Sequence, residues 1–354
     1  MGEKILMKGN EAIGEAAIRA GCRHFFGYPI TPQNELPEYM ARRLPEVGGV
    51  MVQAESEIAA INMVYGAAGA GARVMTSSSS PGISLKQEGL SYIAAAELPC
   101  VIVNMVRGGP GLGGIQPAQS DYWQATKGGG HGDYRMLVLA PASLQEMVDL
   151  VRDAFALADK YRNPVMILGD GMLGQMMEPV MFKDEEVREL PAKEWATTGT
   201  RNHPGRNVIN SLYLQPDRLE AHNEHLQRKY AQMAANEVRY ESVNVEDADL
   251  VVAAFGSTAR IVRSAMEAAR QEGLRVGLIR PITLWPFPEE AFQQAAKTAK
   301  AFLSVEMSAG QMVEDVRLAV NGQKPVYFYG RTGGMIPTPE AVLEKFKKIL
   351  GGEA

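Results

Sequence analysis

Cysteine is almost absent from this sequence, which has only Cys22 and Cys100 among its 354 residues. Two cysteines are too few to build a disulfide framework. They are also too few to hold an iron–sulfur cluster, which usually takes four thiolates. Any electron-transfer centre that serves this protein would therefore lie on another chain.

Long apolar runs and one-sided charge are missing as well. No apolar stretch reaches the roughly 20 residues that a membrane-spanning helix needs, and residues 1–10 lack the apolar core of a signal peptide. The formal net charge is −5 and no basic stripe occurs, which argues against nucleic acid as a main partner. We therefore expect a cytoplasmic protein that binds neither membranes nor nucleic acid.

The chain has enough apolar residues for a large core, because 46% of it is hydrophobic and 22% charged. Predicted strands and helices alternate over residues 1–180 and again over residues 247–354. Between them, residues 181–246 lose this rhythm and contain prolines, charges and one polar helix, which indicates an inter-domain arm that wraps a partner. The alternation predicts the α/β class, with two doubly wound parallel-sheet domains.

The central stretch is a predicted strand over residues 49–53 that leads into a helix. After Glu57 the helix has no charge until Arg73, and a helix that is apolar on every side is predicted to be buried. The N-terminus of a helix favours a negative charge, and apolar surroundings tune its ionisation. Glu55 and Glu57 both fit this position. The simpler interpretation is a capping glutamate in the first helical turn.

Other polar features follow other predicted strand ends. Thr31 lies in a proline-rich turn, residues 76–82 form a hydroxyl-rich loop, and Arg107 precedes the glycine-rich loop 108–117. Ligands of doubly wound sheets bind beyond the carboxyl ends of the strands, so these features predict one site. As alternatives, Thr31 caps its strand end, the serines cap the next helix, and Arg107 forms a structural ion pair.

These motifs together resemble those of the α subunit of 2-oxoacid:ferredoxin oxidoreductases, and the similarity covers nearly the whole chain. Residues 278–288 and 305–311 resemble the transketolase C-terminal-type domain of that family. Residues 107–116 and 128–133 are most similar to the 3-methyl-2-oxobutanoate (2-oxoisovalerate) type. The motifs that carry the resemblance are Tyr28-Pro29-Ile30-Thr31-Pro32, Glu57 with Gly66 nine positions on, residues 76–80, Ala96-Glu97-Leu98-Pro99 and Arg107.

The resemblance implies that residues 1–180 are the pyrimidine-binding domain of a thiamine diphosphate site and residues 247–354 a transketolase C-terminal-like domain. A separate β subunit would hold the diphosphate and Mg²⁺. Further γ and ferredoxin-like δ subunits would carry the [4Fe–4S] clusters. The implied reaction is oxidative decarboxylation of a 2-oxoacid with coenzyme A (CoA), which gives an acyl-CoA, CO₂ and reduced ferredoxin. The chain alone would be inactive.

The resemblance also assigns roles to residues. Glu57 would face N1′ of the aminopyrimidine, a role that requires a carboxylate with a tuned pKa in a dry pocket. Arg107 would bind the substrate carboxylate as a planar fork, and Thr31 would donate to the substrate carbonyl. Residues Ser77 to Ser80 cannot be ranked among themselves. The cofactor-binding set is Glu57, Tyr28, Pro29, Ile30, Ser79 and Ser80.

No metal site is predicted on this chain. Asp170 and Asn202 imitate the metal–diphosphate motif of thiamine diphosphate enzymes, but the segment between them lacks the βα unit that this motif needs, so a strand-end turn is the better interpretation. His222 and His225 lack a ligand pattern and are expected on a solvated face. His131, flanked by glycines, either reaches a ligand or faces solvent, and the loop 108–114 is expected to be a mobile cover.

Three alternatives stay open. The first is the α subunit of a 2-oxoglutarate:ferredoxin oxidoreductase. The second is the β chain of a lipoyl-linked, NAD-coupled branched-chain dehydrogenase, against which the Tyr28–Pro32 turn and the Arg107 loop argue. The third is a non-catalytic scaffold subunit that has kept the fold.

Overall fold

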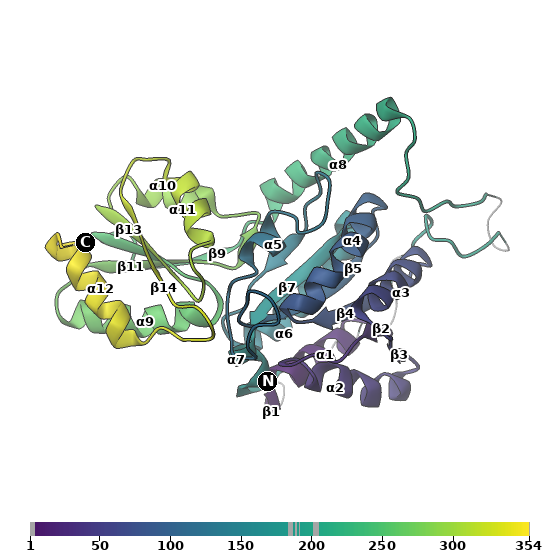
Figure 1. The fold of residues 1–354 in the computed structure, drawn as a ribbon, viewed down its shortest axis with the longest axis horizontal. Helices are drawn as coiled ribbons and strands as arrows, with labels where there is room; N and C mark the ends of the chain where they lie inside the picture. The colour runs from purple at the N-terminus through teal and green to yellow at the C-terminus, as the bar shows by residue number, and fades with distance from the viewer. Residues whose placement is uncertain (1–3, 183–186, 188–189, 191, 201–204, 354) are drawn as a thin grey trace.

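The structure is a computed structural model that describes residues 4–182, 187, 190, 192–200 and 205–353. It contains two α/β units that lie side by side, with the long helix α8 (Pro216–Asn236) extending over the first (Figure 1). Both units have a central sheet covered by helices on its two faces. The predicted α/β class is therefore confirmed.

The first unit is built on a seven-stranded sheet in the order β12-β6-β7-β5-β4-β2-β3. Six strands are parallel, and β12 runs antiparallel to β6 at one edge. The strands are β2 (His24–Gly27), β3 (Val50–Gln53), β4 (Val74–Ser78), β5 (Cys100–Val106), β6 (Leu137–Leu139), β7 (Pro164–Asp170) and β12 (Thr283–Trp285).

Helices cover both faces of this sheet, as right-handed crossovers in a doubly wound sheet require. On one face α1 packs against α2 and α6, and on the other α3 packs against α4. A small antiparallel pair, β1 (Lys4–Lys8) and β8 (Met177–Met181), flanks the first group. The helices are α1 (Gly9–Arg19), α2 (Glu35–Arg43), the 3₁₀ helix η1 (Pro45–Val47), α3 (Glu57–Gly69), α4 (Ser80–Ala95), α5 (Tyr122–Thr126), α6 (Leu144–Tyr161) and α7 (Gly171–Gln175).

The second unit has a five-stranded sheet in the order β14-β13-β10-β11-β9, in which β9 is antiparallel to β11. Helices α9 and α12 pack together, as do α10 and α11, and the two pairs lie on opposite faces (Figure 1). The elements are β9 (Tyr240–Val243), β10 (Leu250–Ala253), α9 (Gly256–Gln271), β11 (Val276–Pro281), α10 (Glu289–Ala295), β13 (Ala301–Glu306), α11 (Met312–Val320), β14 (Val326–Gly330) and α12 (Pro339–Gly351).

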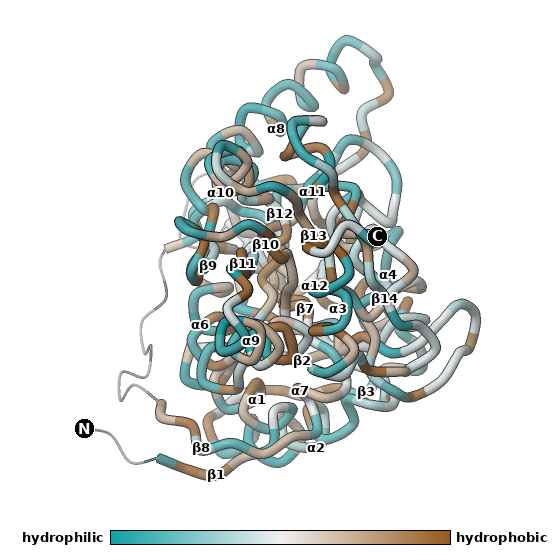
Figure 2. The backbone as a smooth tube through the Cα atoms, turned by 90° about the vertical axis from the view of Figure 1, so that its left-hand side faces the viewer, coloured by the Kyte–Doolittle hydropathy of each residue, from teal (hydrophilic) through white to brown (hydrophobic). Residues whose placement is uncertain are grey.

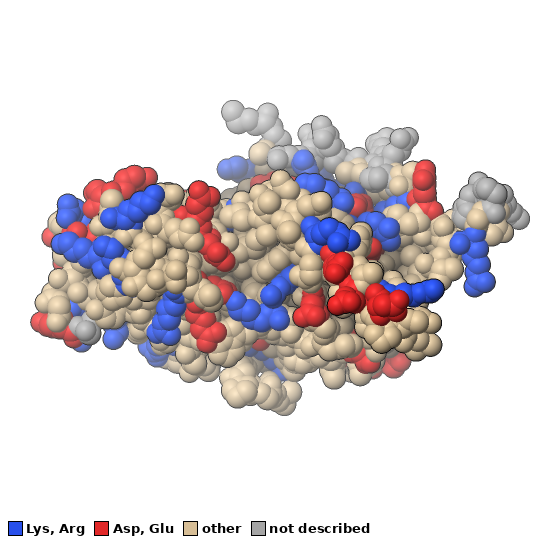
Figure 3. Space-filling view, turned by 90° about the horizontal axis from the view of Figure 1, so that it is seen from above, with Lys and Arg blue, Asp and Glu red and all other residues tan. Residues whose placement is uncertain are grey.

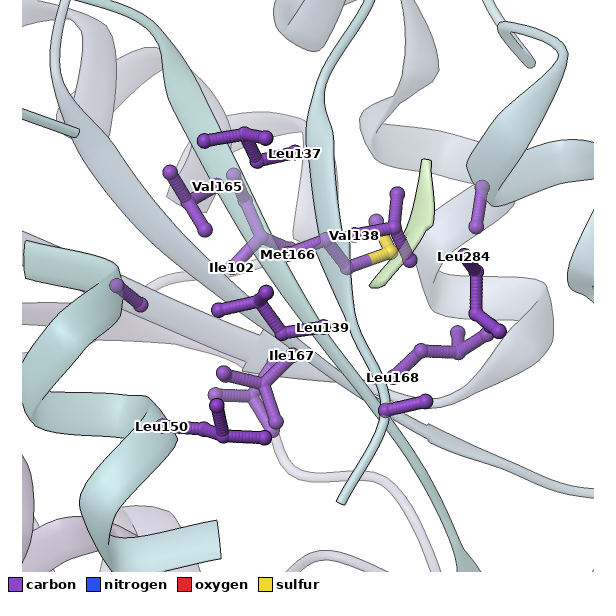
Figure 4. Packing of buried hydrophobic residues seen from close by; sticks show 14 of the residues in the cluster. Ile102, Leu137, Val138, Leu139, Leu150, Val165, Met166, Ile167, Leu168 and Leu284 are labelled. Carbon is purple, nitrogen blue, oxygen red and sulfur yellow. The ribbon is translucent and has the colours of Figure 1, made fainter. Parts of the chain in front are cut away.

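Buried strands supply most of the core. The most hydrophobic backbone segments gather in the middle of the molecule (Figure 2). Around β5, β6 and β7 the side chains of Ile102, Val138 and Met166 pack together, and Leu284 of β12 joins them from the far end of the sequence (Figure 4). A continuous apolar run is what a parallel strand needs when both of its faces are covered.

The structure corrects two expectations about strands. Neither sheet is purely parallel, because β12 and β9 add antiparallel edges. The strand β12 lies in the predicted second domain but pairs in the sheet of the first, and the predicted arm contains β9. Short edge strands between prolines give little periodic signal, and their partners lie far away in sequence.

The central helix α3 is not buried on every side. Ala60, Ile61 and Val64 face the core, whereas Ile58 and Met63 are exposed. The expectation of full burial is therefore wrong for this chain taken alone. The core covers one face of α3. The other face is covered only in part among the described residues, by Ile209 and by Thr197, which bonds the Gly69 oxygen.

The polar helix predicted in the arm is α8, but its histidines are not simply solvated. His222 Nε2 lies 2.8 Å from the main-chain oxygen of Ala95, and its ring stacks on Tyr213. His225 Nε2 lies 3.0 Å from a carboxylate oxygen of Glu97. Both histidines thus help to hold α8 on the C-terminal end of α4.

The described part of the chain offers neither a helix that could span a membrane nor a cluster of metal-ligating side chains. Its helices include none that is both long and apolar enough to cross a membrane. The same residues hold no group of three or more His, Cys, Asp or Glu side chains placed to bind a metal ion. On the face seen in Figure 3, cationic and anionic side chains are interspersed rather than separated.

Candidate functional site

The site begins with Glu57, the first residue of α3. Ser56 caps this helix, because its hydroxyl accepts from the main-chain N–H of Ala59 at 3.2 Å. Glu57 is only 6% exposed, whereas Glu55, two residues earlier, faces solvent. Among the described residues none donates a hydrogen bond to the Glu57 carboxylate. A buried carboxylate at a helix N-terminus is therefore left able to accept a hydrogen bond from a ligand.

The first turn of α4 lies directly against Glu57. A Cβ atom on Gly82 would come within 2.6 Å of Glu57 Oε1 and 2.1 Å of Ser78 Oγ. Only glycine fits there, so the absence of a side chain brings the α4 backbone up to the carboxylate. Helices α3 and α4 thus present their N-terminal turns to the same small volume.

The hydroxyl-rich loop divides into two kinds of serine. The hydroxyls of Ser78 and Ser79 are buried and have no hydrogen-bond partner in the part of the chain that the structure describes, and Ser79 does not cap α4 with its side chain. Ser77 and Ser80 are engaged: Ser77 donates to Gln33, and Ser80 Oγ donates to the main-chain oxygen of Arg107 at 3.2 Å. Buried hydroxyls without partners are costly and indicate a place for a polar ligand or water.

Arg107 is brought to Thr31 across two strand ends. Its Nη1 donates to the main-chain oxygen of Thr31 at 2.9 Å, and Nη2 donates to that of Leu112 at 3.0 Å. Nε is buried without a partner, and the guanidinium, 7% exposed, meets no carboxylate in the described ranges. The alternative of a structural ion pair therefore does not hold, and the positive charge is available to an anionic ligand.

The glycine-rich loop is anchored at its base. Arg107 forms a β-bridge with Pro117, and the Gly108 N–H donates to the Gln116 oxygen at 3.0 Å. Leu112 at the tip is 81% exposed. The loop thus projects from the rim beside Arg107, and its expected role as a mobile cover stays a prediction.

A cavity of about 560 Å³ opens beside Thr31. Its apolar lining comes mainly from Ile115, Met172 and Ile336, and its one charged lining residue is Glu35. None of the described lysines or arginines lines it. The cavity therefore suits an apolar group better than a second carboxylate.

The remaining predicted residues make no side-chain hydrogen bond to this cluster in the described structure. Tyr28, Pro29 and Ile30 follow β2; Tyr28 and Pro29 are exposed and Ile30 is half-buried, and no side-chain hydrogen bond joins the three to Glu57 or Arg107 in the described structure. His131 is exposed and packs edge-on against Tyr92, with ring centroids 5.9 Å apart. Neither arrangement assigns a role, so these residues stay predictions.

Hydrogen bonds within the chain explain why the Asp170 carboxylate is buried. Its Oδ1 accepts from the N–H groups of Met172 and Leu173, at 2.9 and 3.1 Å, which caps α7, and its Oδ2 accepts from Ser257 of the second unit. Burial raises the pKa of this carboxyl above its usual value. The other half of the imitated metal motif, Asn202, lies outside the described residues.

Sequence reasoning missed Lys86, whose side chain is completely buried in α4. Its Nζ donates to Thr76 Oγ1 at 2.9 Å. The signal was present, because Lys86 shares the inward face of α4 with Gly82, Ile83 and Leu90 at helical spacing. A lysine on an apolar stripe is rarely buried without a reason.

Two family models match the chain. The thiamine diphosphate-binding domain of pyruvate flavodoxin/ferredoxin oxidoreductases matches residues 15–245. Core domain II of pyruvate:ferredoxin oxidoreductase matches residues 248–342. Together they define the class of the protein as one that contains a thiamine diphosphate-binding α/β domain.

Characterised relatives narrow this class. The ketoisovalerate oxidoreductase subunit VorB of Methanothermobacter thermautotrophicus is 54% identical over 98% of both chains. The 2-oxoglutarate synthase subunit KorA of the same organism is 38% identical over 99% of this chain and 100% of its own. The chain therefore belongs to the 2-oxoacid:ferredoxin oxidoreductase family, as a subunit of an oxidoreductase, and the expected family is confirmed.

Solved structures agree with this assignment. The 2-oxoglutarate:ferredoxin oxidoreductase from Magnetococcus marinus superposes with a TM-score of 0.89 at 31% identity, over 98% of this chain and 65% of that chain. A split-gene transketolase superposes with a TM-score of 0.61 at 14% identity, which shows the fold alone.

Proposed function

We propose that this chain is the α subunit of a 3-methyl-2-oxobutanoate:ferredoxin oxidoreductase. The enzyme would convert the branched 2-oxoacid and CoA to the branched acyl-CoA, CO₂ and one proton, and pass two electrons to ferredoxin. The substrate is supported by the ketoisovalerate oxidoreductase relative, which is 54% identical over nearly its whole length. The cavity beside Thr31, which has apolar walls at Ile115, Met172 and Ile336 and no described lysine or arginine in its lining, agrees with a branched side chain.

One observation carries the mechanism: the Glu57 carboxylate is buried and accepts no hydrogen bond from the described residues. With the unpartnered hydroxyls of Ser78 and Ser79, it forms a polar recess that fits the aminopyrimidine half of thiamine diphosphate. When bound, this cofactor supplies the nucleophilic carbon that attacks the 2-oxo group and the electron sink that decarboxylation needs. Glu57 would accept a hydrogen bond at N1′ and so favour the tautomer that removes the cofactor's own proton.

The substrate would be held at the neighbouring strand ends. The Arg107 guanidinium has a free Nε and no acidic partner among the described residues, so it can bind the 2-oxoacid carboxylate. The Thr31 hydroxyl lies at the exposed rim, where it can donate to the carbonyl oxygen. The loop that carries Leu112 stands beside both and would exclude water when a partner closes it.

Partner subunits would supply the other parts of the cofactor site and the electron-transfer centres. A β subunit would hold the diphosphate and Mg²⁺, and it would cover the exposed face of α3. The γ and ferredoxin-like δ subunits would carry the [4Fe–4S] clusters, and the assembly would work in the cytoplasm, where ferredoxin and CoA are present.

The test is a substrate panel on the complex assembled anaerobically with its partner subunits. Turnover of 3-methyl-2-oxobutanoate, 2-oxoglutarate, pyruvate and an aryl 2-oxoacid is followed with CoA and a low-potential dye. We expect preference for the branched acid and loss of about 10²–10⁴ in rate in Glu57→Gln. Preference for 2-oxoglutarate would overturn the substrate, and a fully active Glu57→Gln complex would favour the scaffold alternative.

The electron acceptor distinguishes the proposed enzyme from the remaining alternative, a lipoyl-linked dehydrogenase. The complex should reduce ferredoxin and not lipoamide. Reduction of lipoamide, followed by NAD⁺, would instead assign the chain to a lipoyl-linked dehydrogenase.

A further inference from the structure

Lys86 is a completely buried cation that the proposed mechanism does not use. It lies on α4, and its Nζ donates to Thr76 Oγ1 of β4 at 2.9 Å. A lysine ammonium has three N–H donors, and the described residues supply this one acceptor. Within the described ranges no carboxylate lies at ion-pair distance from Nζ. A buried charge in this position needs a counter-charge nearby.

Glu57 is that counter-charge. Its carboxylate contacts the backbone at Gly82, which lies one helical turn before Lys86 on the same face of α4. Thr76 and Ser78 point to one side of β4, because side chains alternate along a strand. Thr76 binds the ammonium, and Ser78 Oγ lies beside the same Gly82 position as the carboxylate. Lys86, Thr76, Ser78 and Glu57 thus form one buried polar column.

The charges around this column are few. Burial lowers the pKa of Lys86 to about 8, and Glu57, the charged group that acts on it from α3, opposes this shift. Other titratable groups meet α4 at other positions. Asp121 accepts from Asn104 of β5 and bonds Ser80, and Tyr134 donates to Gln87. Tyr92 donates to Glu88 and packs against His131, and His222 bonds the last residue of the helix. Glu57 and Lys86 are therefore coupled mainly to each other.

We propose that Lys86 is a positioning residue whose ammonium group holds the Glu57 carboxylate in its ionised form. An ionised carboxylate only accepts hydrogen bonds, whereas a protonated carboxyl also donates. The Lys86 ammonium therefore keeps the Glu57 carboxylate a hydrogen-bond acceptor, which a protonated ring nitrogen requires. The consequence for catalysis rests on the proposed function. The coupling between Lys86 and Glu57 is a property of this chain alone.

The first experiment measures the coupling without any cofactor. Unfolding of the full-length chain by denaturant is compared for wild type, Lys86→Met, Glu57→Gln and the double variant. Below pH 8 the two substitutions should be non-additive, and at pH 10, where Lys86 is neutral, they should become additive. Additive effects at both pH values would overturn the proposal. If Lys86→Met does not fold, Thr76→Val takes its place, because it removes the acceptor that positions the ammonium.

The second experiment measures turnover and thiamine diphosphate affinity of the assembled complex against pH. Lys86→Met should move the acid-side midpoint upward by about one pH unit, and this shift should vanish in a Glu57→Gln background. The matched control is Lys229→Met, which removes another largely buried lysine, paired with Glu97 and remote from Glu57. It should leave the midpoint unchanged.

Two results would overturn the role in catalysis. An equal loss of rate at every pH would make Lys86 a packing residue, and a midpoint shift that persists without Glu57 would show that it acts through another group. If wild type shows no thiamine diphosphate dependence while the unfolding cycle still shows coupling, the proposed function fails and the Lys86–Glu57 pair stands. The two failures are therefore distinguishable.

Discussion

The guanidinium of Arg107 is tied to the main-chain oxygen of Thr31 at 2.9 Å, which joins the end of β5 to the turn after β2. Both contacts of this side chain are to main-chain oxygens, and its charge is not neutralised by a described carboxylate. Neutral donors could also make these two hydrogen bonds, yet the position holds a buried cation. A negatively charged ligand explains the choice of arginine.

Replacing Arg107 tests this explanation. Arg107→Met should lower kcat/KM for the 2-oxoacid by about 100-fold or more, since a hydrogen bond to a charged group contributes about 1.5–3 kcal/mol and two can be lost. Arg107→Lys should recover only part, because an ammonium lacks the planar fork. Leu112→Ala is the control, because it keeps the main-chain oxygen that Arg107 binds. Unchanged KM and kcat in Arg107→Met would contradict the assignment.

Gly82 offers a probe of the Glu57 recess that leaves the charge in place. In Gly82→Ala the new Cβ would overlap Ser78 Oγ and Glu57 Oε1, so the carboxylate or α4 must shift. We expect a loss of thiamine diphosphate affinity in the complex of 10-fold or more, on the order of 1.4 kcal/mol. Binding by titration calorimetry measures this, and wild-type affinity would show that the recess is not the cofactor site.

A substitution at Gly66 distinguishes an effect on the stability of this chain from an effect on assembly with the β subunit. A Cβ at Gly66 meets nothing within 4 Å, and the residue is exposed within α3. Gly66→Ala should therefore stabilise the isolated chain by up to about 1 kcal/mol through helix propensity. If the β subunit covers this face, the same change should weaken assembly, measured by analytical ultracentrifugation. Ser264→Ala, on an exposed position of α9, is the control, and normal assembly of Gly66→Ala would place the partner elsewhere.

Lys86 also predicts a pH dependence of stability. Burial lowers its pKa from 10.5 to about 8, so between these values the unfolded chain binds more protons than the folded one. The free energy of unfolding of wild type should therefore rise relative to Lys86→Met from pH 8 to 10.5, by about 3 kcal/mol in total. The difference should be constant above this window. Taking the difference removes the contributions of Cys22 and Cys100, whose pKa values burial raises to about 12.

How far the sequence predicts the structure differs between elements. The start of α3 follows from local patterns, because capping and periodicity act within a few residues. Those patterns left both Glu55 and Glu57 open, and only the family resemblance favoured Glu57. The exposed side of α3 does not follow, since an apolar face looks the same whether its own sheet or another chain covers it. Lys86 was readable as a polar residue on an apolar stripe, but its link to Glu57 depends on how two helices pack.

Long-range pairing was the part that could not be predicted. β12 has three residues, Thr283–Trp285, and pairs with Leu137–Leu139, more than 140 positions earlier. Gln119 is a similar case: its Nε2 donates to the Phe255 oxygen at 2.8 Å and its Oε1 accepts from Thr258 at 2.8 Å, joining the two units. Neither contact leaves a periodic trace in the sequence.

The strand β12 comes from the second half of the chain but completes the sheet of the first unit. This arrangement has a consequence for any attempt to divide the chain. A fragment that ends before residue 248 would lose this strand and uncover the edge of β6, whose three residues are all apolar and buried in the intact protein. A bare edge of that kind recruits strands from other molecules. Separate expression of the two halves should therefore give a first half that aggregates, and co-expression with the second half should restore it by supplying the missing strand.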